Sequence, residues 1–289
     1  MITHLDEAIR TVVEALRRKD MWDNSLLIAF GDNGGDITTG ASNWPYRGTK
    51  GTVWEGGTKA AAFVHSPNPE IIPESRRGTE SQTLSHVSDW YPTLIAMAGG
   101  DANEGRPASQ PLDSHDVWTA LVQSAPSPRT ELLYALDPVV PEAIQQFCAP
   151  ESQNILFAAL RIGDWKLVEG LPGRGDWYGE DPSLAWPVDY IMGPDVTDFD
   201  AILLSPGGKV GDTGAMEVQR KELDSSQMKR RWLFNLAIDP TETTDLTEAE
   251  PAKVQELLAR LKQLSDEQVS TQLLSLRSNL YLSRQAICC

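Results

Sequence analysis

A short apolar segment, residues 25–30, leads directly into the loop Gly31-Asp32-Asn33-Gly34-Gly35. Its apolar side chains do not alternate with polar ones, which predicts a central parallel strand covered on both faces. Open parallel sheets bind ligands at the carboxyl ends of their strands. Asp32 and Asn33 offer the oxygen ligands that calcium takes, and Lys50 in the following glycine-rich stretch suits an anionic substrate. We therefore expect Asp32, Asn33 and Lys50 to share one pocket.

The segments around this loop predict the first part of an α/β fold. Residues 1–20 have the spacing of an amphipathic helix, and together with the strand at 25–30 they form half of an α/β repeat. A long glycine-rich loop, residues 31–59, precedes a second short strand at 60–64. Residues 88–98 predict a further helix that ends at a pair of glycines.

The second part of the chain has a different pattern. Apolar segments at 131–136, 155–162, 165–168 and 231–236 predict strands, and Gly163-Asp164 is a hairpin signal between the middle two. Pro251 opens an amphipathic helix. We expect a small antiparallel sheet backed by this helix, and two domains, residues 1–127 and 128–289. Residues 171–228 are an irregular insertion, and the tail after residue 264 gives no clear signal.

Composition excludes several classes of function. The net charge of −16 over 289 residues argues against a nucleic-acid partner, which requires an excess of Lys and Arg. An uninterrupted run of about 18 apolar residues is absent from the sequence, so we expect no membrane span. The helix predicted for residues 1–20 is charged throughout and does not have the pattern of a signal peptide. The three cysteines have no metal-binding spacing and do not support a disulfide framework.

Several ordered segments closely resemble the sulfatase family, in particular its arylsulfatase B branch, the N-acetylgalactosamine-4-sulfatase-like enzymes. The likeness covers about residues 5–264 and corresponds to the carboxyl-terminal half of such an enzyme. It is carried by these motifs: Asp32-Asn33-Gly34-Gly35, Asn43-Trp44-Pro45, Arg47-Gly48, Lys50, Trp54-Glu55-Gly56-Gly57, the segments 86–94 and 161–167, and Leu233-Phe234-Asn235-Leu236.

The resemblance implies a fold, a chemistry and site residues. The fold would be a partial alkaline-phosphatase-like catalytic sheet followed by the small α+β domain. Asp32 and Asn33 would bind calcium, and Lys50 would contact the sulfate of a sugar or aryl sulfate ester. The nucleophile of the family is a formylglycine made from the cysteine of Cys-x-Pro-Ser-Arg, which lies before the matching region and outside this chain. Full-length relatives are lysosomal or secreted, but the sequence itself does not set the compartment.

One cysteine segment resembles the nucleophile motif but departs from it. In Cys148-Ala149-Pro150-Glu151-Ser152, glutamate replaces the serine and serine replaces the arginine, and the segment follows the catalytic domain. We therefore reject Cys148 as the nucleophile. Related enzymes pair a cysteine here with one in the following glycine turn, where this chain has Arg174, so the resemblance implies that Cys148 is free.

Other readings of the sequence remain open. The chain is either part of a sulfuric ester hydrolase or an inactive remnant that acts as a partial calcium-binding or interaction protein. A zinc phosphatase or phosphodiesterase of the wider superfamily is a weaker reading. Zinc chemistry recruits further histidine and aspartate ligands, and the site segment offers only one Asp-Asn pair. Arg47 either binds the anionic substrate together with Lys50 or has a structural role. His86 fits a helix start or a packing role better than the role of a metal ligand. Trp44 and Trp54 would either stack on a substrate ring or anchor the loop.

Overall fold

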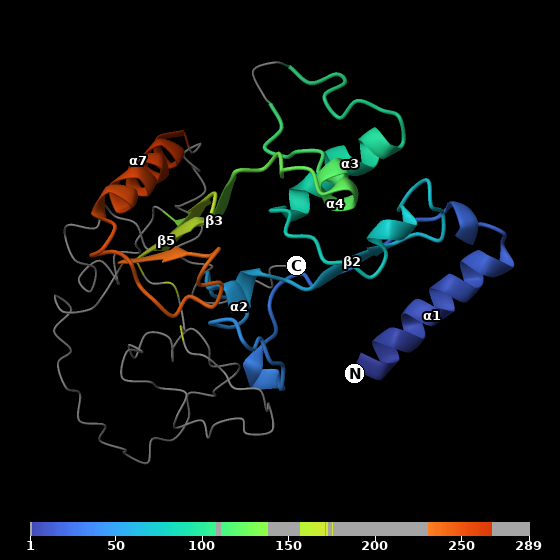
Figure 1. Ribbon diagram of the computed structural model, residues 1–289, viewed down its shortest axis with the longest axis horizontal. Coiled ribbons are helices and arrows are strands. Elements are labelled where there is room, and N and C mark those ends of the chain that lie inside the picture. The colour runs from blue at the N-terminus through green and yellow to red at the C-terminus, as the bar shows by residue number, and fades with distance from the viewer. Residues whose placement is uncertain are drawn as a thin grey trace, which may run out of the picture.

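The computed structural model describes residues 2–107, 111–137, 157–170, 172, 175 and 231–267. Figure 1 shows two parts, one blue to green with short helices and a two-stranded sheet, the other ending in the orange helix α7. The helices are α1 (Ile2–Arg18), α2 (Glu55–Thr58), α3 (Trp90–Met97), α4 (Trp118–Gln123) and α7 (Pro251–Glu267). The strands are β1 (Leu27–Phe30), β2 (Ala62–His65), β3 (Glu131–Asp137), β4 (Phe157–Ile162), β5 (Trp165–Gly170) and β6 (Arg231–Asn235). Short 3₁₀ turns cover Trp22–Asn24, Ile37–Thr39, Glu74–Arg76 and Val87–Asp89.

Strand β1 corrects the prediction of a central parallel strand. It pairs antiparallel with β2, in a register that joins Leu27 to His65 and Phe30 to Ala62. Its side chains are half-buried, and Phe30 is 47% exposed. The prediction failed because an apolar run does not reveal the direction of its partner. Among the strands described here, β1 has β2 as its one neighbour, so much of its surface stays uncovered.

Helix α1 forms where the periodicity predicted it, but it does not bury its apolar stripe. None of its residues is buried, and Ile2 and Leu5 are 85% and 62% exposed. In Figure 1 it extends along one side of the molecule rather than covering the sheet. The α/β repeat predicted for this part is therefore not seen as a packed unit. Across the described residues, no helix is long and apolar enough to cross a membrane.

The antiparallel sheet of the second part is confirmed. Its strand order is β3-β4-β5-β6, and every neighbouring pair is antiparallel. Strands β4 and β5 are joined at the predicted hairpin turn, where Gly163 has a φ of +57°, a conformation that glycine adopts without steric cost. Alternate side chains of each strand point to opposite faces, so the sheet has two separate apolar surfaces.

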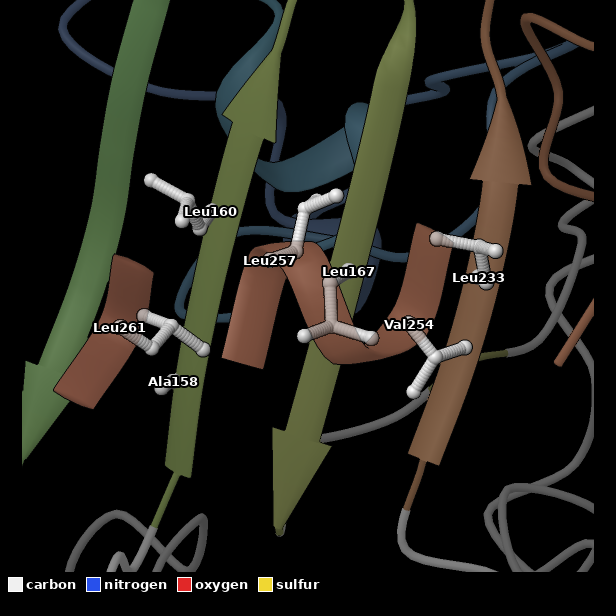
Figure 2. Close-up of a cluster of buried hydrophobic side chains, with 7 residues drawn as sticks. All are labelled: Ala158, Leu160, Leu167, Leu233, Val254, Leu257 and Leu261. Carbon is white, nitrogen blue, oxygen red and sulfur yellow. The ribbon is translucent and has the colours of Figure 1, made fainter. Parts of the chain in front are cut away.

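Helix α7 covers one of these surfaces, as predicted from its apolar stripe. Figure 2 shows its side chains among those of three strands. Leu257 is fully buried, as are Leu160 and Leu167 of the sheet. The cluster drawn consists of Ala158, Leu160, Leu167, Leu233, Val254, Leu257 and Leu261. Burial of a leucine contributes about 1.5–3 kcal/mol, so this face is the main hydrophobic core of the second part.

The opposite surface of the same sheet is covered by the loop that follows β1. Ala159, Val168 and Phe234 pack there against Val53 and Trp54. Trp54 is 1% exposed. The second part therefore forms the support on which the loop rests.

Some predictions concern residues outside the described ones. They include Cys148, Arg174, most of the insertion at 171–228, and the tail beyond residue 267. The division into domains 1–127 and 128–289 also stays a prediction. The segment between the end of α4 at Gln123 and the start of β3 at Glu131 contains the expected boundary.

Candidate functional site

The loop between β1 and β2 folds into two arms that meet at helix α2. The first arm is residues 31–35, and the second is residues 47–50. The amide of Gly34 donates to the carbonyl of Gly57 at 2.9 Å, and the amide of Gly56 donates to the carbonyl of Arg47 at 2.6 Å. Helix α2 therefore holds both arms through its backbone.

Glycine is required where the first arm crosses α2. A Cβ on Gly34 would lie 1.7 Å from the carbonyl oxygen of Gly56, and a Cβ on Gly56 would lie 2.4 Å from that of Arg47. Both distances are far below van der Waals contact. The two glycine-containing motifs, Asp32-Asn33-Gly34-Gly35 and Glu55-Gly56-Gly57, are therefore the two sides of one backbone contact.

Lys50 is brought beside the first arm by backbone and side-chain hydrogen bonds. Its amide donates to the carbonyl of Gly35 at 3.2 Å. Asn43 reinforces the contact, because its Oδ1 accepts from the Gly35 amide at 2.7 Å and its Nδ2 donates to the Gly35 carbonyl at 2.8 Å. The same Nδ2 donates to the carbonyl of Gly48 at 3.2 Å. Asn43 thus ties the two arms together, a role that the sequence pattern alone did not assign.

The oxygen groups of the first arm are open to solvent. Asp32 is exposed and Asn33 is half-buried. The Nδ2 of Asn33 donates to the carbonyl of Gly34 at 2.7 Å, which leaves its Oδ1 able to bind a cation. The donor set suits a hard cation but supplies only two side chains, fewer than the six to eight oxygens that calcium takes. Among the described residues, no group of three or more His, Cys, Asp or Glu side chains could hold a metal ion.

Arg47 and Trp54 anchor the second arm. The guanidinium of Arg47 lies 3.8 Å from the centre of the Trp54 ring, and its Nε donates to the carbonyl of Gly175 at 2.5 Å. Trp54 makes edge contacts with Trp232 and Phe234, at centroid distances of 5.4 and 6.1 Å. Of the two readings left open for each residue, the structure supports loop anchoring. Trp44, in contrast, is 47% exposed.

A buried charged network lies directly behind helix α2. Lys166 of β5 places its Nζ 2.8 Å from an oxygen of Glu55 and 2.8 Å from an oxygen of Glu242. Tyr134 of β3 donates to the same Glu55 oxygen at 3.2 Å, and its ring centre lies 4.4 Å from the ammonium. The Glu55 amide donates to Oε2 of Glu242 at 2.7 Å. We call these four residues, Glu55, Tyr134, Lys166 and Glu242, the Lys166 network.

The pKa shifts of the Lys166 network follow from burial and from these contacts. Burial alone would lower the pKa of Lys166, but the carboxylates of Glu55 and Glu242 outweigh it and raise that pKa. Burial opposes ionisation of Glu55, yet Lys166 holds its pKa below the usual value. Burial raises the pKa of Glu242, helped by the Glu55 charge. The pKa of Tyr134 is raised to about 12, chiefly by burial. The ammonium is therefore charged, and Glu55 is the more acidic of the two carboxyls.

His86 starts a helical segment, as its position suggested. Its ring accepts from the Ser88 amide, and its own amide donates to Asp89 at 2.7 Å. Asp89 forms a buried bidentate ion pair with Arg129. Burial and the charge of Arg129 lower the pKa of His86, which keeps the ring neutral.

Comparison with known proteins agrees with this architecture. Residues 1–100 match the family model described as Sulfatase. Arylsulfatase J of Mus musculus is 37% identical over 268 residues, which cover 92% of this chain and 39% of that protein. The chain thus spans about two fifths of the length of this curated relative.

Solved structures show the same fold. Ps i-CgsB in complex with k-i-k-neocarrahexaose matches with a TM-score of 0.60 at 19% identity. The match covers 99% of this chain and 47% of that one. The PsFucS1 sulfatase from Pseudoalteromonas sp. has a TM-score of 0.51 at 17% identity over 91% of this chain and 42% of that one. The chain therefore has part of the α/β sulfatase fold. Sequence similarity to the sulfatase family model extends over residues 1–100.

Proposed function

We propose that this chain supplies part of the active site of a sulfuric ester hydrolase of the arylsulfatase B-like branch. One observation carries the proposal: the Lys50 amide is hydrogen-bonded to Gly35, two residues beyond Asn33. This backbone contact brings together the two loop segments that carry a carboxylate, an amide oxygen and a cationic side chain. A sulfate ester needs positive charge on its non-bridging oxygens as the ester oxygen leaves.

Within this site, each residue has a separate role. The side-chain oxygens of Asp32 and Asn33 would hold calcium, which when bound supplies positive charge beside the sulfate. Lys50 would contact a sulfate oxygen and neutralise part of its charge. Because the described loop offers only the side chains of Asp32 and Asn33, further ligands would be needed to complete the about six to eight oxygens that calcium prefers.

The nucleophile of the proposed reaction lies outside this chain. By family resemblance it is a formylglycine made from Cys-x-Pro-Ser-Arg, and Cys148 lacks the serine and arginine of that motif. We therefore propose that the isolated chain does not hydrolyse sulfate esters. The substrate would be a sulfate ester of a sugar or an aryl alcohol. Trp44 is exposed on the same loop, and its ring would stack on the substrate.

The test is a chimera in which this chain replaces the matching part of mouse arylsulfatase J. Hydrolysis of 4-nitrocatechol sulfate should fall by about 10²- to 10³-fold in Asp32→Ala and in Lys50→Ala, the usual cost of one preorganised electrostatic contact. The unmodified mouse protein gives the reference rate. An active chimera that is indifferent to both changes would contradict the proposal, as would a folded chimera that has no turnover. For the isolated chain, turnover that Cys148→Ala abolishes would show that Cys148 is a nucleophile.

The second candidate is a catalytically inactive remnant that acts as an interaction or partial calcium-binding protein. The observation that favours it is that several apolar side chains of the first part are exposed, among them Leu5 and Val12 of α1 and Phe30 and Phe63 of the small sheet. Exposed apolar patches of this kind commonly mark interaction sites. Genomic sequence upstream of Met1 separates the candidates, because an in-frame Cys-x-Pro-Ser-Arg would favour the enzyme.

A further inference from the structure

Helix α2 is the point at which both arms of the candidate site are held. The Gly57 carbonyl receives the amide of Gly34 from the first arm, and the Gly56 amide donates to Arg47 at the start of the second arm. The position of α2 therefore sets the position of Asp32 and Asn33 relative to Lys50. Anything that fixes α2 also fixes the site.

The first residue of α2 is fixed from the side opposite the site. Glu55 is 5% exposed, and its carboxylate contacts Lys166, which is fully buried in the sheet. The Glu55 amide donates to Glu242, and Glu242 also contacts Lys166. Glu242 therefore holds both the start of α2 and the lysine that pairs with the Glu55 carboxylate. A single ammonium thus joins α2, strand β5 and the turn at residue 242.

Glu242 is held in an unusual backbone conformation. It has a φ of +57° and is fully buried, although it is neither glycine nor asparagine. The turn around it is secured by Asp239, whose carboxylate accepts from the amides of Thr243 at 3.1 Å and Thr244 at 2.7 Å. Residues in such sparsely populated conformations persist where the surrounding structure requires them. Here the conformation directs a carboxylate at α2.

We propose that Lys166 and Glu242 are positioning residues for the sulfate site and act through Glu55 and helix α2. The inference rests on the proposed function for its biological meaning, but its geometry is independent of it. Replacing a buried ion pair by apolar side chains of similar volume is often neutral or stabilising, so such a pair is weak evidence for a role in stability. The Lys166 network would keep the two arms in register, although burying its charges carries a desolvation penalty that an apolar contact would avoid.

Hydrogen exchange of the full chain tests this inference. The reporters are the amides of Gly34, Lys50 and Gly56, whose hydrogen bonds join the two arms to each other or to α2. In Glu242→Ala, which removes the acceptor of the Glu55 amide, these amides should exchange at least about tenfold faster, as expected for loss of one hydrogen bond. Amides of β4 and β5 should keep their protection. Glu242→Gln retains an acceptor oxygen and should restore the protection of all three reporters.

A control and a second variant complete the experiment. Arg231→Gln breaks the ion pair with Glu169 in the same sheet, which does not reach α2, and should leave the reporters unchanged. Lys166→Met should speed their exchange as Glu242→Ala does. Equal acceleration of all amides in both variants would show a purely structural role and overturn the proposal, as would reporters that keep wild-type protection.

The same samples separate this inference from the proposed function. Added calcium and sulfate should slow exchange at Lys50 in the wild-type chain. If they do not, sulfate binding by this chain fails, while selective loosening in Glu242→Ala still supports positioning of the arms. If calcium and sulfate slow exchange at Lys50 but neither variant selectively speeds exchange of the reporter amides, the sulfate site is supported and the positioning role is refuted.

Discussion

Removal of the Arg129 side chain should destabilise the first part of the chain substantially. Asp89 is fully buried, and its carboxylate accepts from Arg129 Nε at 2.8 Å, from Arg129 Nη2, and from the amides of His86 and His115 at 2.7 and 2.9 Å. Arg129 also donates to the carbonyl of Asp113 at 2.8 Å. The pair therefore joins three segments that are distant in the sequence.

The expected magnitude follows from the charge that Arg129→Met would leave behind. Breaking a buried pair by removing one partner costs about 3–5 kcal/mol, because the remaining charge is uncompensated. Asp89 would keep its two amide donors, so we expect the lower end, about 3 kcal/mol. Urea unfolding followed by tryptophan fluorescence measures the loss. A loss below about 1 kcal/mol, the size expected of a surface pair, would refute the reasoning.

The pH dependence of this contribution has a definite sign. Burial alone would raise the pKa of Asp89, but the hydrogen bonds from Arg129, His86 and His115 hold it below its ordinary value of 3.8. A group with a depressed pKa stabilises the fold above its unfolded pKa, and this stability is lost as the pH falls through the folded pKa. Arg129→Met should therefore flatten the decline in stability below about pH 4. A decline as steep as in the wild type would assign the acid sensitivity to other carboxyls.

Three further predictions concern the core, the loop and the metal. Leu257→Ala should cost about 2–5 kcal/mol in urea unfolding, because the side chain is fully buried between α7 and the sheet; a loss within 0.5 kcal/mol would contradict that packing. Gly34→Ala should release the first arm from α2, seen as fast exchange of the Gly34-position amide; unchanged protection would show that the arms do not cross there. Calcium should bind with a dissociation constant weaker than about 10⁻⁴ M in calorimetry, because only Asp32 and Asn33 contribute; a tight site that survives Asp32→Ala would refute the assignment.

The sheet and helix of the second part could be predicted because their signals are local. The short apolar segments, the Gly163 turn and the stripe on α7 each depend on neighbours within a few residues. The pairing of β1 could not be predicted in the same way. An apolar run is equally compatible with either strand direction, and the direction is set by the path of the chain through residues 31–61.

The candidate site was only partly visible in the sequence. The strand-loop order suggested that Lys50 returns to the first arm, and the backbone contact with Gly35 agrees. The clamp by Asn43 and the Lys166 network were missed. Glu55 lies 111 residues from Lys166 and 187 from Glu242, so the contacts depend on the tertiary fold. One signal was available: Lys166 lies within the apolar segment at residues 165–168, where an unpaired charge would be costly.

Sulfate binding by the chain itself tests the central claim most directly. Backbone amide shifts of the ¹⁵N-labelled protein can be followed as sulfate is added with and without calcium. We predict weak, calcium-dependent shifts centred on Asn33, Gly35 and Lys50, which Asp32→Ala and Lys50→Ala each abolish while the rest of the spectrum is retained. Shifts centred elsewhere, or shifts at the loop that persist in Lys50→Ala, would contradict the assignment of this loop as a sulfate site.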